Sequence, residues 1–176
     1  TFAVKRARVQ LDAALTDQTA VRVQVETAPN STLYDAYCSF KEPAYNATIR
    51  AGQFKVPLSY EVIEPISSIW ERELSEMWSR LIPRVRDVGI HLNVKGKGTQ
   101  PSWDAAVLNG NGRNNADNNE HKDLLLRALV PFSQGTAELA YYTGKFTTGT
   151  PAVTTVRTRA VLGAEADLGQ VQVRTE

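Results

Sequence analysis

The chain has few of the residues that build covalent or metal-held frameworks. Among 176 residues there are one cysteine, one methionine and two histidines. Cys38 has no partner for an internal disulfide, and His91 and His121 have no neighbouring ligand cluster. We therefore expect neither a disulfide framework nor a metal site.

Signals of enzyme chemistry are also missing. The sequence has no nucleophile elbow and no phosphate-cradling glycine loop, because Gly110 and Gly112 lack the strand-to-helix context and the lysine that such a loop needs. Cys38 lies in the middle of a predicted strand on its apolar face, which predicts a buried, inert thiol. We expect no enzymatic activity and no cofactor.

Excess charge and long apolar runs are absent as well. Lysine and arginine number 20 against 19 acidic residues, so the net charge of +1 gives no reason to expect a nucleic-acid partner. No apolar run approaches the roughly 18 residues of a transmembrane helix. A transmembrane strand needs only about 10 residues, so this absence does not exclude a membrane protein.

Two-residue alternation of apolar and polar side chains is the main pattern in the sequence. Val88, Ile90, Leu92 and Val94, for example, alternate with polar residues or glycine, which is typical of strands with one apolar face. Similar segments predict about ten strands, and the short turns between them predict antiparallel pairing. The predicted strand segments are 7–13, 21–25, 34–40, 45–49, 88–94, 103–107, 124–130, 136–146, 153–164 and 169–176.

Alternation alone fits two all-β architectures. In a soluble sandwich the apolar faces meet in a core, whereas in a membrane barrel they contact lipid and the polar faces line a lumen. Apolar faces rich in alanine and valine, and polar faces with repeated arginine, aspartate, glutamine and asparagine, favour the barrel. Aromatic residues near the segment ends favour it too, as in an interfacial girdle. These aromatics are Tyr34, Phe40, Tyr45, Trp103, Phe132, Tyr141 and Phe146.

Two segments interrupt the alternation. Residues 65–81 carry apolar side chains at helical spacing, which predicts a loop helix of about four turns that either closes the end of a barrel or enters its lumen. Residues 109–120 contain six asparagines and two glycines and predict a long polar loop. Asp117 and Glu120 within it suggest calcium, but their spacing does not match an EF-hand loop.

Two stretches resemble a known family. They are 50–59, RAGQFKVPLS, and 86–127, which begins RDVGI and continues with AAVLNGNGRN at 105–114. Their order and spacing resemble the phosphate-selective porins of the O and P type, and the resemblance covers roughly residues 2–132. It implies part of an antiparallel transmembrane β-barrel of about 16 strands. It also implies a bacterial outer-membrane location, contact with the lipid bilayer and a homotrimer.

Such a porin needs far more chain than 176 residues. Residues 1–176 are therefore expected to form a single barrel segment, the N-terminal part of a larger barrel. The last seven residues alternate like a strand and then stop, which agrees with a fragment. The resemblance implies a passive diffusion channel for small solutes, with anions such as phosphate as candidates.

The polar faces supply the cations that an anion pathway would use, since fixed cations replace part of an anion's hydration. The expected lumen residues are Arg6, Arg8, Arg22, Arg50, Lys55, Arg127, Arg157 and Arg159. The same faces also carry acidic residues, so pairing within the protein is the alternative role for these cations. Those acidic residues are Asp12, Glu26, Asp35, Asp87 and Asp123.

Three functions therefore remain open at the level of sequence. The first is the porin; the second is an outer-membrane barrel that does not conduct and anchors or assembles with other envelope components. The third is a soluble β-sandwich that serves as a binding module.

Overall fold

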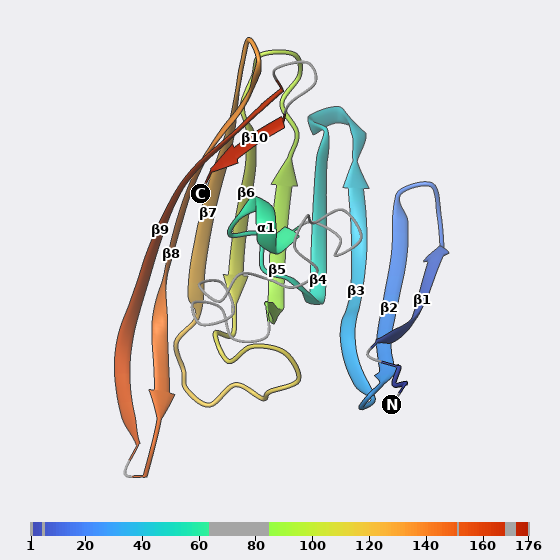
Figure 1. The fold of residues 1–176 in the computed structure, drawn as a ribbon, viewed down its shortest axis with the longest axis vertical. Coiled ribbons are helices and arrows are strands. Elements are labelled where there is room, and N and C mark those ends of the chain that lie inside the picture. Colours follow the sequence, from blue (N-terminus) through green and yellow to red (C-terminus); the bar gives the residue numbers. More distant parts are fainter. Residues whose placement is uncertain (1, 5, 64–84, 151, 168–171, 176) are drawn as a thin grey trace.

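The structure, a computed structural model, describes residues 2–4, 6–63, 85–150, 152–167 and 172–175. These residues form one antiparallel sheet with little helix (Figure 1). The strands are β1 (Ala7–Ala14), β2 (Thr19–Ala28), β3 (Thr32–Glu42), β4 (Ala47–Lys55), β5 (Arg86–Val94), β6 (Ser102–Leu108), β7 (Asp123–Phe132), β8 (Gly135–Thr148), β9 (Val153–Asp167) and β10 (Gln172–Thr175). The helices are the 3-10 helix η1 (Pro43–Tyr45) and α1 (Tyr60–Ile63).

The sheet has the simplest possible topology. Each strand pairs antiparallel with the next strand in the chain, in the order β1 to β10. Within the described ranges β1 and β10 do not pair with each other, so the sheet is open. The expectation of an all-β antiparallel sheet is confirmed, whereas the closed barrel is not seen. No helix in the described part of the chain is both long enough and apolar enough to cross a membrane.

One face of the sheet, here called the outer face, is apolar and exposed. Residues paired across antiparallel strands lie on the same face, so the register joins these side chains into one continuous surface. It includes Val9, Leu11, Val23, Phe40, Ile49, Ile90, Leu92, Trp103, Val107, Leu124, Leu126, Leu139, Tyr141 and Leu162, each at least 36% exposed. No second sheet covers this face in the described residues.

The apolar side chains of the alternating pattern thus lie on the outer face. Cys38 also lies among them, across from Ala51 on β4. The prediction that its thiol is buried is wrong, because the thiol is exposed. The prediction assumed that an apolar strand face must be covered, and on this sheet it is not.

The two ends of the sheet differ. The connections 15–18, 43–46, 95–101 and 133–134 all lie at one end, and each is short. The long connections 56–85 and 109–122 lie at the opposite end, together with the short connections 29–31 and 149–152. Four exposed aromatics, Phe40, Tyr45, Trp103 and Phe132, lie near the end with the connections 15–18, 43–46, 95–101 and 133–134, whereas exposed Tyr141 lies within β8.

A β-bulge in β3 changes the face of two side chains. The register between β2 and β3 shifts at Gln24 and Val25, so that Leu33 pairs with Val25 while Asp35 pairs with Gln24. Tyr34 is the extra residue and joins the charged face, whereas Leu33 is exposed with the apolar side chains. Strict two-residue alternation along this segment predicts Tyr34 on the apolar face with Cys38 and Leu33 on the polar face, and the bulge reverses both because it breaks that period.

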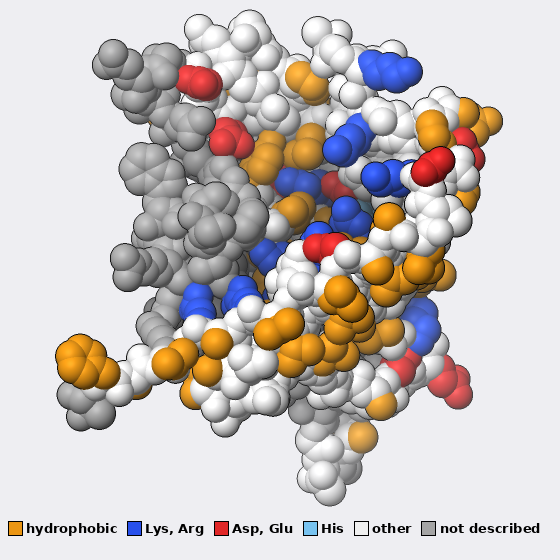
Figure 2. Space-filling view, turned by 90° about the vertical axis from the view of Figure 1, so that its right-hand side faces the viewer, with side chains coloured by type: hydrophobic (Ala, Val, Ile, Leu, Met, Phe, Trp, Pro, Cys, Tyr) orange, Lys and Arg blue, Asp and Glu red, His pale blue; other side chains and the backbone are white. Residues whose placement is uncertain are grey.

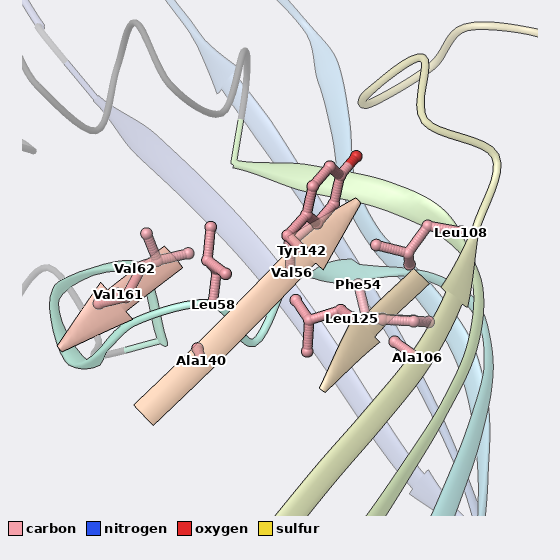
Figure 3. Packing of buried hydrophobic residues seen from close by; sticks show 10 residues of the cluster. All are labelled: Phe54, Val56, Leu58, Val62, Ala106, Leu108, Leu125, Ala140, Tyr142 and Val161. Atoms are coloured by element: carbon pink, nitrogen blue, oxygen red, sulfur yellow. The ribbon is translucent and has the colours of Figure 1, made fainter. Parts of the chain in front are cut away.

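The opposite, inner face of β6–β9 carries the hydrophobic core. Val56 and Leu58, which follow β4, and Val62 of α1 lie in this core cluster, which is drawn in Figure 3. The cluster consists of Phe54, Val56, Leu58, Val62, Ala106, Leu108, Leu125, Ala140, Tyr142 and Val161. The start of the long connection therefore packs on the inner face. The predicted helix at 65–81 lies outside the described residues.

The segment 109–122 is a loop, as its asparagine content predicted, and it is fastened to strand ends. Gln53 both accepts a hydrogen bond from the Asn114 N–H (2.8 Å) and donates one to its Oδ1 (3.0 Å). Asp87 accepts from the Gly110 N–H (2.9 Å), and Asn118 donates to the Thr147 carbonyl (3.0 Å). The asparagine side chains thus satisfy backbone groups at the ends of several strands.

Candidate functional site: the charged inner face

The inner face of β1–β7 borders a hollow of about 690 Å³. Figure 2 shows lysine and arginine side chains gathered inside this depression, beside hydrophobic side chains on the surface. Its lining is mostly polar: Arg8, Gln10, Arg22, Gln24, Asp35, Tyr37, Arg50, Phe54, Lys55, Pro57, Ile63, Arg86, His91, Asn93, Asp104, Arg127 and Leu129. This space is the main hollow of the sheet.

The structure brings most of the expected lumen residues together. Arg8, Arg22, Arg50, Lys55 and Arg127 line the main hollow. Arg157 and Arg159 instead line a second cavity near the loop 109–122. Arg6 precedes β1, is exposed and lines neither space.

At the β1–β3 side of the hollow the arginines are paired with carboxylates. Arg8 Nε lies 2.8 Å from Glu26 Oε2, and Arg22 Nε lies 2.5 Å from Asp12 Oδ1. Gln10 links this group by donating to Asp12 and accepting from Gln24. The alternative role that the sequence left open, pairing within the protein, therefore applies to these arginines.

A buried charge network forms the floor of the hollow. Asp104 contacts His91 Nε2 (2.8 Å) and Arg127 Nη1 (3.2 Å), and Arg127 Nε also pairs with Glu138. All four side chains are at most 5% exposed. Glu138 also accepts from the Tyr60 N–H (3.2 Å), so the network ties α1 to the sheet.

Sequence reasoning missed Arg86 as a member of the site. Its Nε lies 2.7 Å from Asp35 Oδ1, and its guanidinium lies 4.5 Å from the centre of the Tyr34 ring. Arg8 and Arg113 approach the same ring at 4.6 and 4.3 Å. One signal could have identified Arg86, because it is the first residue of the second stretch that resembles the porin family. The apolar–polar alternation starts only after Arg86, which directly follows Val85 with its positive φ of 59°.

Arg50 differs from the other arginines of the main hollow. Its guanidinium lies 5.6 Å from the centre of the Tyr37 ring, and no carboxylate in the described residues pairs with it. An aromatic face attracts a cation without cancelling its charge. Arg50 therefore contributes a net positive charge to the hollow.

The polar loop offers little for a metal. The described residues contain no group of three or more histidine, cysteine, aspartate or glutamate side chains able to hold one. Asp117, a residue of the calcium hypothesis, instead pairs with Lys122. That ammonium group holds the pKa of Asp117 below its usual value. His121 Nε2 lies 3.2 Å from Lys145 Nζ.

Asp123 of β7 joins β8 and β9 beside the second cavity. Its fully buried carboxylate accepts from the Lys145 N–H (3.0 Å), pairs with Arg157 (3.2 Å) and contacts the Tyr142 hydroxyl. A Cβ atom at Gly144 would overlap that carboxylate. We expect Gly144→Ala to lower the free energy of unfolding by about 3 kcal/mol, measured by urea titration in detergent.

The neighbouring Thr143→Ala is the control for that prediction. Thr143 lies on the outer side of the same strand, where the one contact of its hydroxyl among the described residues is with Thr158 at 3.5 Å. This variant is expected to change stability by less than about 0.5 kcal/mol. Equal stability of the Gly144→Ala and Thr143→Ala variants would show that the Asp123 carboxylate is not held as described.

Comparison with known proteins adds no assignment. No family model matches the chain. No curated protein matches it significantly. The candidate function therefore depends on the geometry of the sheet and on the resemblance seen in the sequence.

Proposed function

We propose that this chain is part of a porin-type outer-membrane β-barrel whose charged inner face lines a passive path for small solutes, anions such as phosphate among them. One observation carries the proposal: the continuous apolar outer face lies opposite a charged, hollowed inner face. Large exposed apolar surfaces are unusual on water-soluble monomers, whereas a transmembrane strand presents such a face to lipid.

The asymmetry of the sheet supports the same proposal. Transmembrane barrels have short turns at one end and longer loops at the other, with aromatic residues near the membrane interfaces. Here the long connections 56–85 and 109–122 share one end, and exposed Phe40, Tyr45 and Trp103 lie toward the other. Because unpaired strand edges are not tolerated in hydrocarbon, the proposal requires further strands between the β1 and β10 edges. Assembly into a trimer is proposed from the family resemblance alone.

A second function has a specific observation in its favour. Residues 56–63 pack on the inner face of β6–β9, and most arginines of the main hollow are paired with carboxylates. Packing and pairing of this kind stabilise a filled interior. They favour a structural outer-membrane barrel that does not conduct and that anchors or assembles with other envelope components.

Conductance separates the two functions. The complete barrel that contains this chain would be purified and reconstituted into planar bilayers, and single-channel currents would be recorded in potassium chloride. A porin is expected to give stepwise currents, whereas the structural barrel is expected to give none. Absence of current from correctly inserted protein would contradict the transport proposal and support the structural one.

Arg50→Gln tests which charge sets the ion preference. Since Arg50 has no carboxylate partner among the described residues, its removal is expected to shift the reversal potential in a salt gradient toward cations. Lys97→Gln is the matched control, because Lys97 is exposed in the connection 95–101 and lines neither cavity. Equal reversal potentials for both variants would remove Arg50 from the pathway.

A further inference from the structure

The second cavity has a volume of about 180 Å³. This is roughly the volume that six molecules of liquid water occupy. Its charged and polar walls include Arg86, Asp87, Asn111, Tyr142, Arg157 and Arg159. They come from β5, β8, β9 and the loop 109–122. The second cavity is distinct from the main hollow, and Arg86 is the residue that lines both.

Arg157 is held in place but keeps one unmet donor. Its Nη2 donates to the Gly110 carbonyl (2.6 Å) and to Asp123 (3.2 Å). Its Nε is buried and has no acceptor among the described residues. Buried donors without partners are rare in folded proteins, and each calls for an explanation such as a bound ligand or water.

Arg159 forms no ion pair with a carboxylate within the described ranges. Its guanidinium lies 4.9 Å from the centre of the Tyr142 ring. Arg157 and Arg159 are two residues apart on β9, so both face the cavity. Arg86 and Arg157 each have an aspartate partner, and the wall carboxylate Asp87 is held by backbone N–H groups, so Arg159 is the wall arginine that pairs with no carboxylate among the described residues.

Asn111 presents the opposite requirement. Its Nδ2 donates to the Ala116 carbonyl (2.8 Å), which orients the amide. Its Oδ1 is buried and has no donor among the described residues. The neighbouring Asp87 oxygens already accept from the Val88 and Gly110 N–H groups, and its carboxylate disfavours a ligand of high negative charge.

We propose that the second cavity binds a small monoanion that carries a hydrogen-bond donor beside its charge. A short hydroxy-carboxylate and dihydrogen phosphate share this chemistry. The anionic oxygens satisfy Arg157 Nε and Arg159, and the ligand hydroxyl donates to Asn111 Oδ1. This goes beyond the pore proposal, because an anion path requires only positive charge, whereas this cavity also requires a donor.

Calorimetric titration of the full chain in detergent tests the donor requirement. Sodium lactate and sodium propionate are matched in size and charge, but only lactate has a hydroxyl. Lactate is expected to bind at least about tenfold more tightly, since a buried acceptor left unpaired costs more than 1 kcal/mol. Equal binding of both, or saturable binding of neither at millimolar concentration, overturns the proposal.

A second pair of probes identifies the source of the anion. Phosphate and sulfate are compared at mildly acidic pH, where phosphate carries one negative charge and two hydroxyls, whereas sulfate carries two negative charges and no hydroxyl. Phosphate is expected to bind more tightly than sulfate, and the tighter of phosphate and lactate is the preferred ligand class. Preference for sulfate contradicts the donor requirement.

Variants locate the site. Arg159→Gln is expected to weaken lactate binding at least about tenfold, with partial recovery in Arg159→Lys, and Asn111→Ala to reduce it to the level of propionate. Lys41→Gln makes the same change of net charge outside the cavity and should leave binding unchanged. Full binding by Arg159→Gln and Asn111→Ala overturns the assignment. Binding without conductance would overturn only the pore, and conductance without binding only this site.

Discussion

Replacing Leu126 by arginine is expected to cost about 2–4 kcal/mol of stability in a bilayer, because the guanidinium would have to enter hydrocarbon. Leu126 lies near the middle of β7 on the outer face and is 52% exposed. Its cross-strand neighbours are Ala105 and Tyr141, so no carboxylate faces it across the sheet. The measurement is urea unfolding of the chain reconstituted in lipid vesicles.

Leu126→Ile is the matched control, since it keeps an apolar side chain at the same position and should fold into vesicles almost as well as the parent. The expected effect is large only if this face contacts lipid. An exposed leucine on a water-soluble sheet can usually be replaced by arginine at a cost within about 0.5 kcal/mol. A Leu126→Arg variant with unchanged stability would therefore favour the soluble β-sandwich.

Arg127→Met is expected to lower the free energy of unfolding by about 3–5 kcal/mol, because Asp104 and Glu138 would remain buried without their cation. Arg127 is 4% exposed at its side chain, and its partners are 5% and 0% exposed. Because Glu138 also accepts from the Tyr60 N–H, we expect α1 to lose protection from amide exchange in the same variant. Unfolding titrations and hydrogen exchange measure the two effects.

The exposed pair of Arg22 and Asp12 provides the comparison. Their side chains are 37% and 51% exposed, and Arg22→Gln should cost less than about 1 kcal/mol. Similar losses in Arg127→Met and Arg22→Gln would mean that water reaches the floor of the main hollow and screens the buried network.

The fold could be predicted from the sequence where the pattern was local. The period of two along β5 fixed Ile90 and Leu92 on one face and His91 on the other, and the structure has them so. Alternation distinguishes the faces whatever lies next to them. Alternation could not show whether an apolar face is covered by other parts of the protein. For that reason the prediction of a buried thiol at Cys38 was wrong.

Features that depend on contacts between distant segments were not predictable. The bulge at Tyr34 places this ring beside Arg8, Arg86 and Arg113, and only the pairing of β2 with β3 reveals it. The packing of Val56 and later residues on β6–β9 likewise joins segments about 50 residues apart or more. Neither contact leaves a local pattern in the sequence.

The candidate site was predictable in its residue types and not in its partners. Arginines on the polar faces were identified from spacing, but spacing could not tell Arg50, which lies by the Tyr37 ring, from Arg22, which is paired with Asp12. Selectivity depends on that difference, since a paired cation contributes little net charge. The unmet groups of Arg157 and Asn111 likewise depend on the folded position of the loop.

Spin labels on two adjacent residues test the central claim most directly. Cys38 is the only cysteine and lies exposed on the outer face, while Ser39 lies on the inner face opposite Arg50. One label is attached to Cys38 and the other to Ser39→Cys in a Cys38→Ala background. Both proteins are reconstituted in vesicles, and relaxation by oxygen and by a water-soluble nickel complex is compared.

We predict that oxygen, which concentrates in hydrocarbon, relaxes the label at position 38, and that the nickel complex relaxes the label at position 39. This result would place the apolar face in lipid and the charged face in water. Access of the nickel complex to position 38 equal to or greater than that to position 39 would contradict the account.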